Sequence, residues 1–155
     1  MSACPQLSPA SLPAQPADPE AVRAFEDALL AHPQVQIETQ HVIHGGMCAR
    51  TIRIPAGVAL TGALLGVDNI CIAHGDITVT TDRGPVRLTG YHVIGAAAGR
   101  KRAGVAHADT YWTTVWRTAL TDLQAIEDEL TVEADRLQTR QALAAQTKEP
   151  LECPQ

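Results

Sequence analysis

Histidines and an aspartate in the centre of the chain have the chemistry of metal ligands. The sequence contains six histidines, and five fall in this central part: His41, His44, His74, His92 and His107. Imidazole nitrogens and carboxylate oxygens are common ligands of zinc and iron(II). One hypothesis is therefore a metal site made of His44, Asp68 and His107. The alternative hypothesis is that the histidines bond to backbone groups at strand ends.

A glycine-rich turn carries three consecutive cations, Arg100, Lys101 and Arg102. Backbone N–H groups of such a turn, together with arginine side chains, can hold a phosphate or a carboxylate. These three residues are therefore candidates for an anion site. In the alternative interpretation, the arginines pair with carboxylates of the same chain, namely Asp68, Asp82 or Asp109.

The four cysteines, Cys4, Cys48, Cys71 and Cys153, do not have the spacing of a zinc ribbon. Cys71 lies between two isoleucines and is predicted to be a small buried residue. Cys4 and Cys153 lie in polar ends that contain proline. Two hypotheses stay open for this pair, which are free thiols on two tails or a disulfide between chain ends or between subunits.

Between residues 34 and 118, apolar residues recur with the period of two that is typical of β-strands. Ile52 and Ile54 are predicted to share one strand face, and Arg50, Thr51 and Arg53 are assigned to the other. A hairpin is predicted with its turn at residues 82–85. About eight short strands separated by turn signals indicate an all-β barrel or jelly roll.

Helices are predicted on both sides of this barrel, at residues 18–33 and 121–149. The first begins with a capping aspartate and a proline, and the second with a capping box. The second is predicted as one long helix that either packs across its own barrel or forms a seam between subunits. The candidates for that oligomer interface are Leu123, Ile126, Leu130 and Leu137.

The two ends of the chain are predicted to contribute little to the barrel itself. Residues 1–17 are rich in proline and alanine and have no hydrophobic period, so they are predicted to form an extended arm. Residues 150–155 are predicted to form a short tail.

Four stretches, "ARTIRIPAG", "TG", "GRKRAG" and "AHADTYWTT", follow one another in this order. Their order and spacing resemble the cupin superfamily, an RmlC-like jelly roll with a double-stranded β-helix, over about residues 40–118. The resemblance is closest to small cupin-like proteins encoded in bacteriophage genomes. It implies a fold with an all-β core, to which the two predicted helices are added.

The resemblance also implies where a cupin metal site would lie. Its first motif ends at Gly75, which puts Asp68 at the glutamate position and the two histidine positions within residues 61–64, where no histidine stands. In the second motif Gly99 is the glycine, and Arg102 takes the histidine position. A guanidinium is permanently charged and repels a cation. The resemblance therefore implies a barrel that has lost its metal site, with no cofactor; zinc or iron is the alternative.

Composition and charge exclude several kinds of partner. The net charge is −5, and lysines and arginines do not form a stripe, which argues against nucleic acid. Apolar runs are too short to span a membrane, and the first residues lack the pattern of a signal peptide. We therefore expect the protein in the cytoplasm of the cell that makes it.

The expected function is that of a non-enzymatic, homo-oligomeric protein that acts through protein contacts. The resemblance implies a phage virion component for decoration or assembly, located in the virion, or a small early protein that binds a host factor or sequesters a small molecule. Two alternatives stay open. One is a metal-dependent cupin enzyme with relocated ligands, and the other is a module that binds a small anion.

Overall fold

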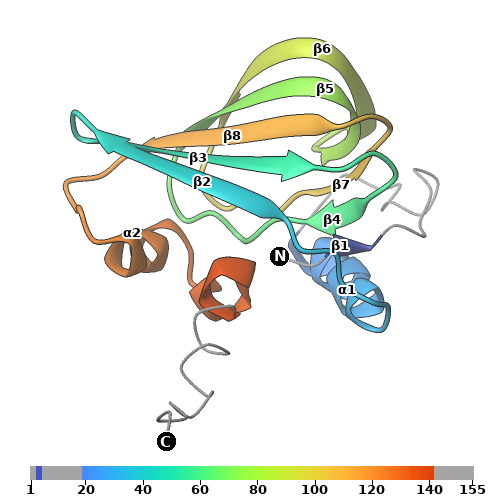
Figure 1. The fold of residues 1–155 in the computed structure, drawn as a ribbon, viewed down its shortest axis with the longest axis horizontal. Coiled ribbons are helices and arrows are strands. Elements are labelled where there is room, and N and C mark those ends of the chain that lie inside the picture. Colours follow the sequence, from blue (N-terminus) through green and yellow to red (C-terminus); the bar gives the residue numbers. More distant parts are fainter. Residues whose placement is uncertain (1–2, 5–18, 142–155) are drawn as a thin grey trace, which may run out of the picture.

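Antiparallel strands form the centre of the computed structural model, which describes residues 3–4 and 19–141 (Figure 1). The strands are β1 (Ala3–Cys4), β2 (Glu38–His44), β3 (Met47–Ile54), β4 (Ala59–Thr61), β5 (Asn69–Thr81), β6 (Gly84–Ala96), β7 (Ala103–Ala106) and β8 (Thr110–Arg117). The helical elements are α1 (Pro19–Leu30), α2 (Leu123–Leu130) and the short 3₁₀ helix η2 (Ala134–Arg136). Among these residues no helix has the length and apolar character needed to cross a bilayer.

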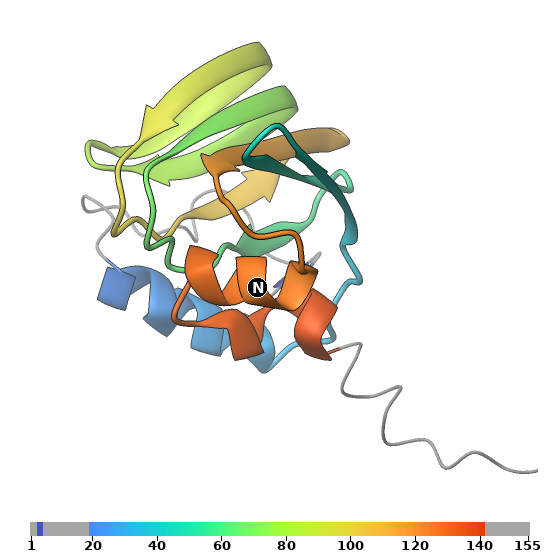
Figure 2. The same cartoon turned by 90° about the vertical axis from the view of Figure 1, so that its left-hand side faces the viewer.

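The strands form one curled sheet in the order β1-β4-β7-β5-β8-β3-β2, with β6 paired to β5 outside this path. β5 and β6 pair along their whole length, from Asn69 with Ala96 to Thr81 with Gly84. The other edge of β5 is shared, because its first half pairs with β8 and its second half with β7. The sheet therefore curls into two layers, with the helices along one side and the β5–β6 hairpin arching on the other (Figures 1 and 2).

This architecture confirms the prediction of an all-β jelly-roll core with an N-terminal helix and a C-terminal helical region. The predicted hairpin is present, but its turn is shorter than residues 82–85, because β5 ends at Thr81 and β6 begins at Gly84. The expectation of about eight strands between residues 34 and 118 is slightly too high, since seven lie there. The reason is that Asn69–Thr81 and Gly84–Ala96 each run as one strand instead of as two, while the short strand β4 was not predicted. Within the predicted arm, Ala3 and Cys4 pair with β4, and its other residues lie outside the described ones.

β5 changes its partner at Gly75, and the close packing there leaves no room for a side chain. Gly75 has φ 145°, and a Cβ atom at this position would lie 2.5 Å from Thr110 Oγ1 and 2.8 Å from the Asp109 carbonyl oxygen. The amide of Asp76 donates a hydrogen bond to Thr110 Oγ1 at 3.1 Å, which fixes the corner. The two layers are joined at this corner.

We expect Gly75→Ala to lower the free energy of unfolding by about 2–4 kcal/mol, because the new methyl group overlaps backbone and hydroxyl atoms that cannot move apart freely. Urea denaturation followed by circular dichroism measures the change. Gly66→Ala is the matched control, since a Cβ atom there meets nothing closer than 3.7 Å. Equal stability of the two variants would contradict the proposed crowding at the corner.

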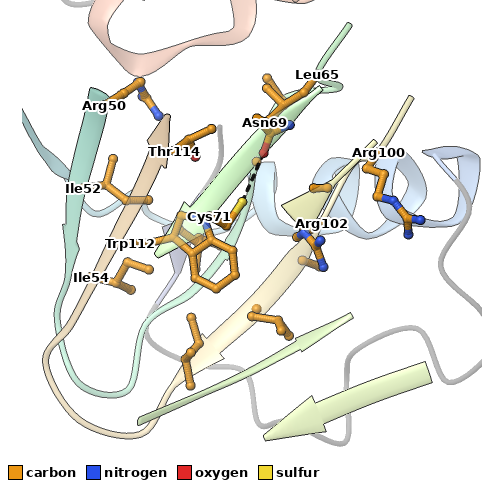
Figure 3. A pocket seen from close by; sticks show the side chains of 18 of the residues that line it. Arg50, Ile52, Ile54, Leu65, Asn69, Cys71, Arg100, Arg102, Trp112 and Thr114 are labelled. Carbon is orange, nitrogen blue, oxygen red and sulfur yellow. Dashed lines mark hydrogen bonds between the residues drawn. The ribbon is translucent and has the colours of Figure 1, made fainter. Parts of the chain in front are cut away.

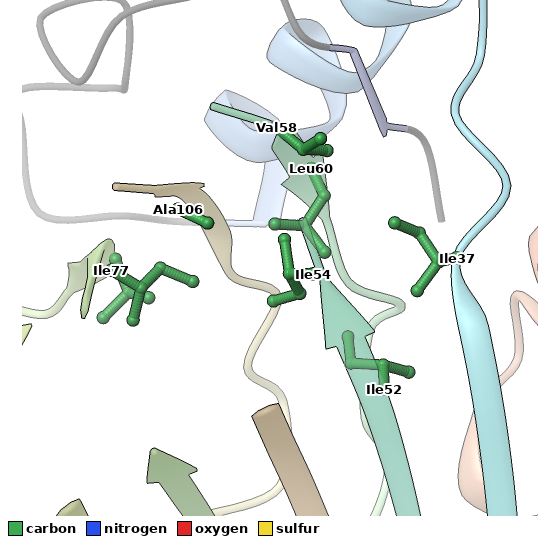
Figure 4. Close-up of a cluster of buried hydrophobic side chains, with 8 residues drawn as sticks. Ile37, Ile52, Ile54, Val58, Leu60, Ile77 and Ala106 are labelled. Carbon is green, nitrogen blue, oxygen red and sulfur yellow. The ribbon is translucent and has the colours of Figure 1, made fainter. Parts of the chain in front are cut away.

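The core between the two layers is aliphatic (Figure 4). It consists of Ile37, Ile52, Ile54, Val58, Leu60, Ile77, Val79 and Ala106. Arg50 lies on the same inner face of β3 as Ile52 and Ile54 and is buried with them. The prediction that Arg50 shares the outer face with Thr51 and Arg53 is therefore wrong, because residues two apart on a strand point to the same side.

α1 covers one layer of the sheet. Val22 and Leu29 are fully buried in a cluster with Ala59 of β4 and Val105 of β7. These two helix positions are seven residues apart, so they lie on one face of the helix. The N-terminal helix thus closes the β4–β7 side of the barrel.

The C-terminal segment is not the single helix predicted for residues 121–149. α2 ends at Leu130 because Thr131 is extended, with φ −149° and ψ 143°. The 3₁₀ helix η2 follows, and helical backbone begins again at residue 138. Residues 142–149 lie outside the described part of the chain. The side chain of Glu133 is drawn inward by buried partners, and this tertiary contact outweighs the local preference for a continuous helix.

The break turns apolar residues of this segment toward their own barrel. Ile126 and Leu130 pack with Cys48 and Trp116, and Leu137 is also buried. Ile126, Leu130 and Leu137 were predicted to lie at an oligomer interface. That prediction is wrong for these three residues, because each is buried within its own chain. Leu123, the fourth candidate, is half-buried.

Candidate anion site in the barrel

A cavity of about 100 Å³ lies between the layers of the sheet (Figure 3). Strands β3, β4, β5, β7 and β8 supply most of its wall, and Leu130 and Leu137 complete it from the C-terminal segment. Most of the wall is aliphatic, with Ile52, Ile54, Leu60, Ile77 and Val79 among its residues. A small apolar chamber with a few polar groups is the usual form of a site for a small molecule.

Arg50 places a positive charge in this apolar wall. Its side chain is 8 % exposed, and its Nε and Nη2 atoms are buried without a hydrogen-bond partner in the described part of the chain. Burial lowers the pKa of Arg50, and the nearby carboxylate of Glu127 acts against this shift. That carboxylate accepts its hydrogen bond from Thr139 at 2.8 Å. A buried charge without a direct partner costs several kcal/mol, so an anion in contact with Arg50 would be strongly favoured.

Further nitrogen atoms without partners lie beside Arg50 on the inner face. His41 is opposite Arg50 in the β2–β3 pairing, and its Nε2 atom is buried without a hydrogen bond to a described residue. The same holds for Nε1 of Trp116, which is opposite Cys48 in the β3–β8 pairing. Burial and then the charge of Arg50 lower the pKa of His41, which favours the neutral form of its ring. Arg50 and Trp116 therefore provide donors without acceptors at this end of the barrel, whereas the role of His41 Nε2 depends on the tautomer of its ring.

A second guanidinium reaches the cavity from the segment before β7. Arg102 lines the cavity, and its Nη1 donates to the Thr80 carbonyl oxygen at 3.3 Å. Figure 3 shows Arg50 on one side of Cys71 and Trp112, and Arg102 on the other. Burial raises the pKa of the Cys71 thiol, which donates to Asn69 Oδ1 at 3.2 Å. The cavity therefore carries positive charge on two sides and a neutral thiol between them.

The three cations of the glycine-rich turn, together with Asp82, line a second hollow of about 220 Å³, but their charged groups have different partners. Arg100 pairs with Asp82, as the alternative interpretation predicted. Lys101 is fully buried, and its Nζ atom lies 3.0 Å from Glu26 Oε2 and 2.8 Å from Glu133 Oε2. The ammonium group of Lys101 is already neutralised by two carboxylates, so the anion site stays a prediction for the other two cations of the turn. Arg102 alone of the three both lines the cavity and keeps no carboxylate of the described residues within ion-pair distance.

Lys101 is the centre of an ion cluster that joins distant parts of the chain. Glu26 belongs to α1 and also pairs with Arg136 of η2 at 2.6 Å. Glu133 pairs with Arg23 of α1 at 2.8 Å and accepts a hydrogen bond from the Leu64 amide. The cluster therefore holds α1, η2 and the glycine-rich turn together. It is a structural feature, since its charges are satisfied by one another.

The proposed metal ligands are not brought together. His44 is exposed at the β2–β3 turn, and Asp68 is exposed and accepts a hydrogen bond from the Ala98 amide at 2.9 Å. His107 Nε2 lies 2.7 Å from Thr78 Oγ1. Across residues 3–4 and 19–141, no three His, Cys, Asp or Glu side chains are grouped so that they could hold a metal ion.

The cysteines divide into two groups. Cys48 and Cys71 are buried free thiols, as predicted for Cys71. The side chains of Cys4 and Cys153, and with them the hypothesis of a disulfide, lie outside what the structure describes.

Arg50 is the residue of the candidate site that reasoning from sequence missed. A signal for it was present, since Arg50 is two and four residues from Ile52 and Ile54 on an alternating strand. The alternation places a charged residue among inward-facing ones. A charge in that position is either an error in the predicted strand or a group with a special role.

Neither a family model nor a curated protein matches this chain. Among solved structures, KdgF from Halomonas sp. has 18 % sequence identity and a TM-score of 0.47, over 59 % of this chain and 88 % of that one. A cupin superfamily protein of Desulfitobacterium hafniense has 12 % identity and a TM-score of 0.45, over 59 % and 85 %. An RmlC-like cupin family protein of Methanocaldococcus jannaschii, with a double-stranded β-helix fold, has 12 % identity and a TM-score of 0.45, over 54 % and 81 %.

Solved structures similar to this chain are thus cupin superfamily proteins. At these identities and TM-scores they carry no argument about the cavity, which is described from the side chains of this chain alone. The resemblance to phage-encoded proteins is not tested by these structures and stays a prediction.

Proposed function

We propose that this chain is a non-enzymatic, cupin-like protein that binds a small organic anion inside its barrel. The observation that carries the proposal is the buried guanidinium of Arg50, whose Nε and Nη2 atoms have no partner among the described residues. These two atoms lie on the same edge of the guanidinium, and together they match the two oxygens of a carboxylate. A carboxylate is therefore the favoured anionic group.

The rest of the cavity supports a ligand with a compact apolar body. The wall around Arg50 is aliphatic, so a hydrocarbon chain would replace contacts with water by contacts with Ile52 and Ile54. An apolar cavity of about 150 Å³ holds benzene, so a somewhat smaller one fits roughly three to five carbon atoms. The positive charges of Arg50 and Arg102 disfavour a divalent cation at this wall, which supports binding without a metal.

Calorimetric titration with straight-chain carboxylates, from acetate to hexanoate, tests this proposal. Each acid is compared with the primary amide of the same length, which has a similar shape and no charge. We expect the carboxylate to bind at least tenfold more tightly than its amide, with the best affinity near butanoate, because a hydrogen bond to a charged group contributes about 1.5–3 kcal/mol. Equal affinity of acid and amide, or no binding of any acid in the series, would overturn the proposal.

The other functions that the sequence suggested are not part of this proposal. The relocated metal site is not assembled among the described residues, so the metal-dependent enzyme is not proposed. The virion and host-factor roles implied by the family resemblance stay predictions, because no described residue bears on either of them.

A further inference from the structure

One surface of the barrel is both exposed and largely apolar. It is the outward side of the layer formed by β2, β3, β8, the first half of β5 and the second half of β6, and we call it the outer face (Figure 1). The described residues expose eleven large hydrophobic side chains, and six of them belong to the outer face: Val42, Met47, Ile70, Tyr91, Val93 and Tyr111. A contiguous patch of exposed apolar side chains on a folded protein usually contacts another macromolecule.

The strand register aligns one apolar residue from each strand into a row across the outer face. In spatial order the row is Gly95, Ile70, Val115, Ala49 and Val42. Val115, on β8, is the middle residue. One strand away from Val115, the large side chain of Ile70 lies on one side and the small one of Ala49 on the other. Two strands away, the large side chain of Val42 lies on one side and Gly95, without a side chain, on the other. The row is therefore complementary in shape to a second copy of itself in which the order of the strands is reversed.

We propose that the outer face is the interface of a homodimer, with the two-fold axis running along β8. This axis reverses the order of strands in the second copy and keeps each row opposite itself. Ile70 then meets Ala49 of the second copy, Val42 meets Gly95, and Val115 meets its own counterpart. A heterologous partner would have no reason to match this symmetry in size, so a second copy of the chain is the occupant that the face fits.

The charges at the border of the outer face are compatible with such a dimer. Arg53 is held by Asp109 of the same chain at 2.6 Å and lies 3.9 Å from Glu38. At the opposite border, Arg117 and Asp68 have opposite charge. Neither border carries a field of one sign that would repel a second copy. An apolar centre with a polar rim is the usual composition of a protein interface.

The area of the outer face predicts a moderate affinity. Five strands about 4.8 Å apart, each with about six residues rising 3.3 Å, form a surface of roughly 24 by 20 Å. Two such faces bury on the order of 1,000 Å² in total, which is near the lower limit for a specific interface. We therefore expect a dimer that dissociates in the micromolar range. The inference is independent of the anion site, because the cavity lies on the opposite side of these strands.

A charged residue placed on the two-fold axis tests whether the dimer forms through the outer face. Sedimentation velocity of the full chain should show a monomer–dimer equilibrium, and Val115→Asp should weaken it at least 100-fold by placing two carboxylates against each other. Val132→Asp is the control, since Val132 is 88 % exposed and lies outside the outer face. A full chain that stays monomeric at about 100 µM, a concentration well above a micromolar dissociation constant, would overturn the inference. So would a Val115→Asp variant that dimerises like the parent.

Cross-linking tests the position of the axis without depending on a destabilised variant. In a background with Cys4→Ser and Cys153→Ser, we expect Val115→Cys to link to itself through a bis-maleimide with a spacer of about 8 Å, since packed sheets lie about 10 Å apart. Ile70→Cys should link only when Ala49→Cys is present in the same chain. Efficient linking of Ile70→Cys to itself would contradict an axis along β8.

Discussion

Replacement of Arg50 by methionine is expected to abolish anion binding and, at the same time, to raise the stability of the ligand-free protein. Methionine has a similar length and no charge, so the carboxylate loses both hydrogen bonds of the guanidinium. We expect at least a 100-fold loss of affinity by calorimetry, which corresponds to about 2.8 kcal/mol. The free energy of unfolding in urea should rise by about 1–3 kcal/mol, because a buried charge without a direct partner has been replaced by an apolar side chain.

Two further variants separate charge from geometry. Arg50→Lys keeps a positive charge and loses the paired donors, so it should bind the carboxylate weakly and gain no stability. Arg53→Met removes an arginine from the same strand on the exposed side, where its ion pair with Asp109 contributes little, so neither binding nor stability should change by more than about 1 kcal/mol. A destabilised Arg50→Met protein would show that Arg50 has a structural partner, and it would refute the anion site.

Replacement of Lys101 by methionine is expected to have the opposite effect on stability. Glu26 and Glu133 would remain buried without the ammonium group that lies within 3.0 Å of both. Breaking a buried ion pair by removing one partner typically costs about 3–5 kcal/mol, and we expect the free energy of unfolding to fall by this amount. Arg87→Met is the control, since Arg87 forms an exposed pair with Asp76 and its loss should cost about 0–1 kcal/mol. Similar losses in the two variants would mean that the Lys101 cluster is solvated.

The same cluster predicts how stability depends on pH. Burial raises the pKa of Glu133, but hydrogen bonds from Lys101, the Leu64 amide and Arg23 outweigh it and lower the pKa from 4.5 to about 2. Because the folded value lies below the unfolded one, this carboxylate stabilises the fold above about pH 4.5, and its contribution disappears as the pH falls toward 2. The loss amounts to about 3 kcal/mol. Urea denaturation between pH 7 and pH 2 should show it in the parent, and Lys101→Met should reduce the slope.

The elements that depend on local pattern were predictable, and those that depend on distant contacts were not. The period of two predicted the strands, and residues 82–85 predicted the turn of the long hairpin. Lys101 was assigned to an anion-binding turn because its partners Glu26 and Glu133 are 75 and 32 residues away in the sequence. No local rule indicates that these carboxylates converge on it.

The C-terminal segment and Arg50 show two different kinds of failure. The residues after Leu130 have a helical pattern, and the break there depends on the inward pull on Glu133, which is a tertiary effect. Arg50, in contrast, was assigned to the wrong face although the alternation of its own strand already gave the answer. The fold was accessible from the sequence. The cavity was not, because it depends on how two layers pack and on which of their charges find partners.

The way in which β5 is shared has a consequence for how the barrel opens. β6 pairs with every residue of β5 on one edge, while β8 and β7 divide the other edge. One layer therefore cannot detach while the other stays intact, because the strand common to both would have to break in its middle. Amide protons of β5 should consequently exchange with solvent only through global unfolding, and the two layers behave as one cooperative unit. The sheet therefore does not open to release a ligand enclosed between its layers. The ligand can exchange with solvent only when the helices and loops that close the cavity move.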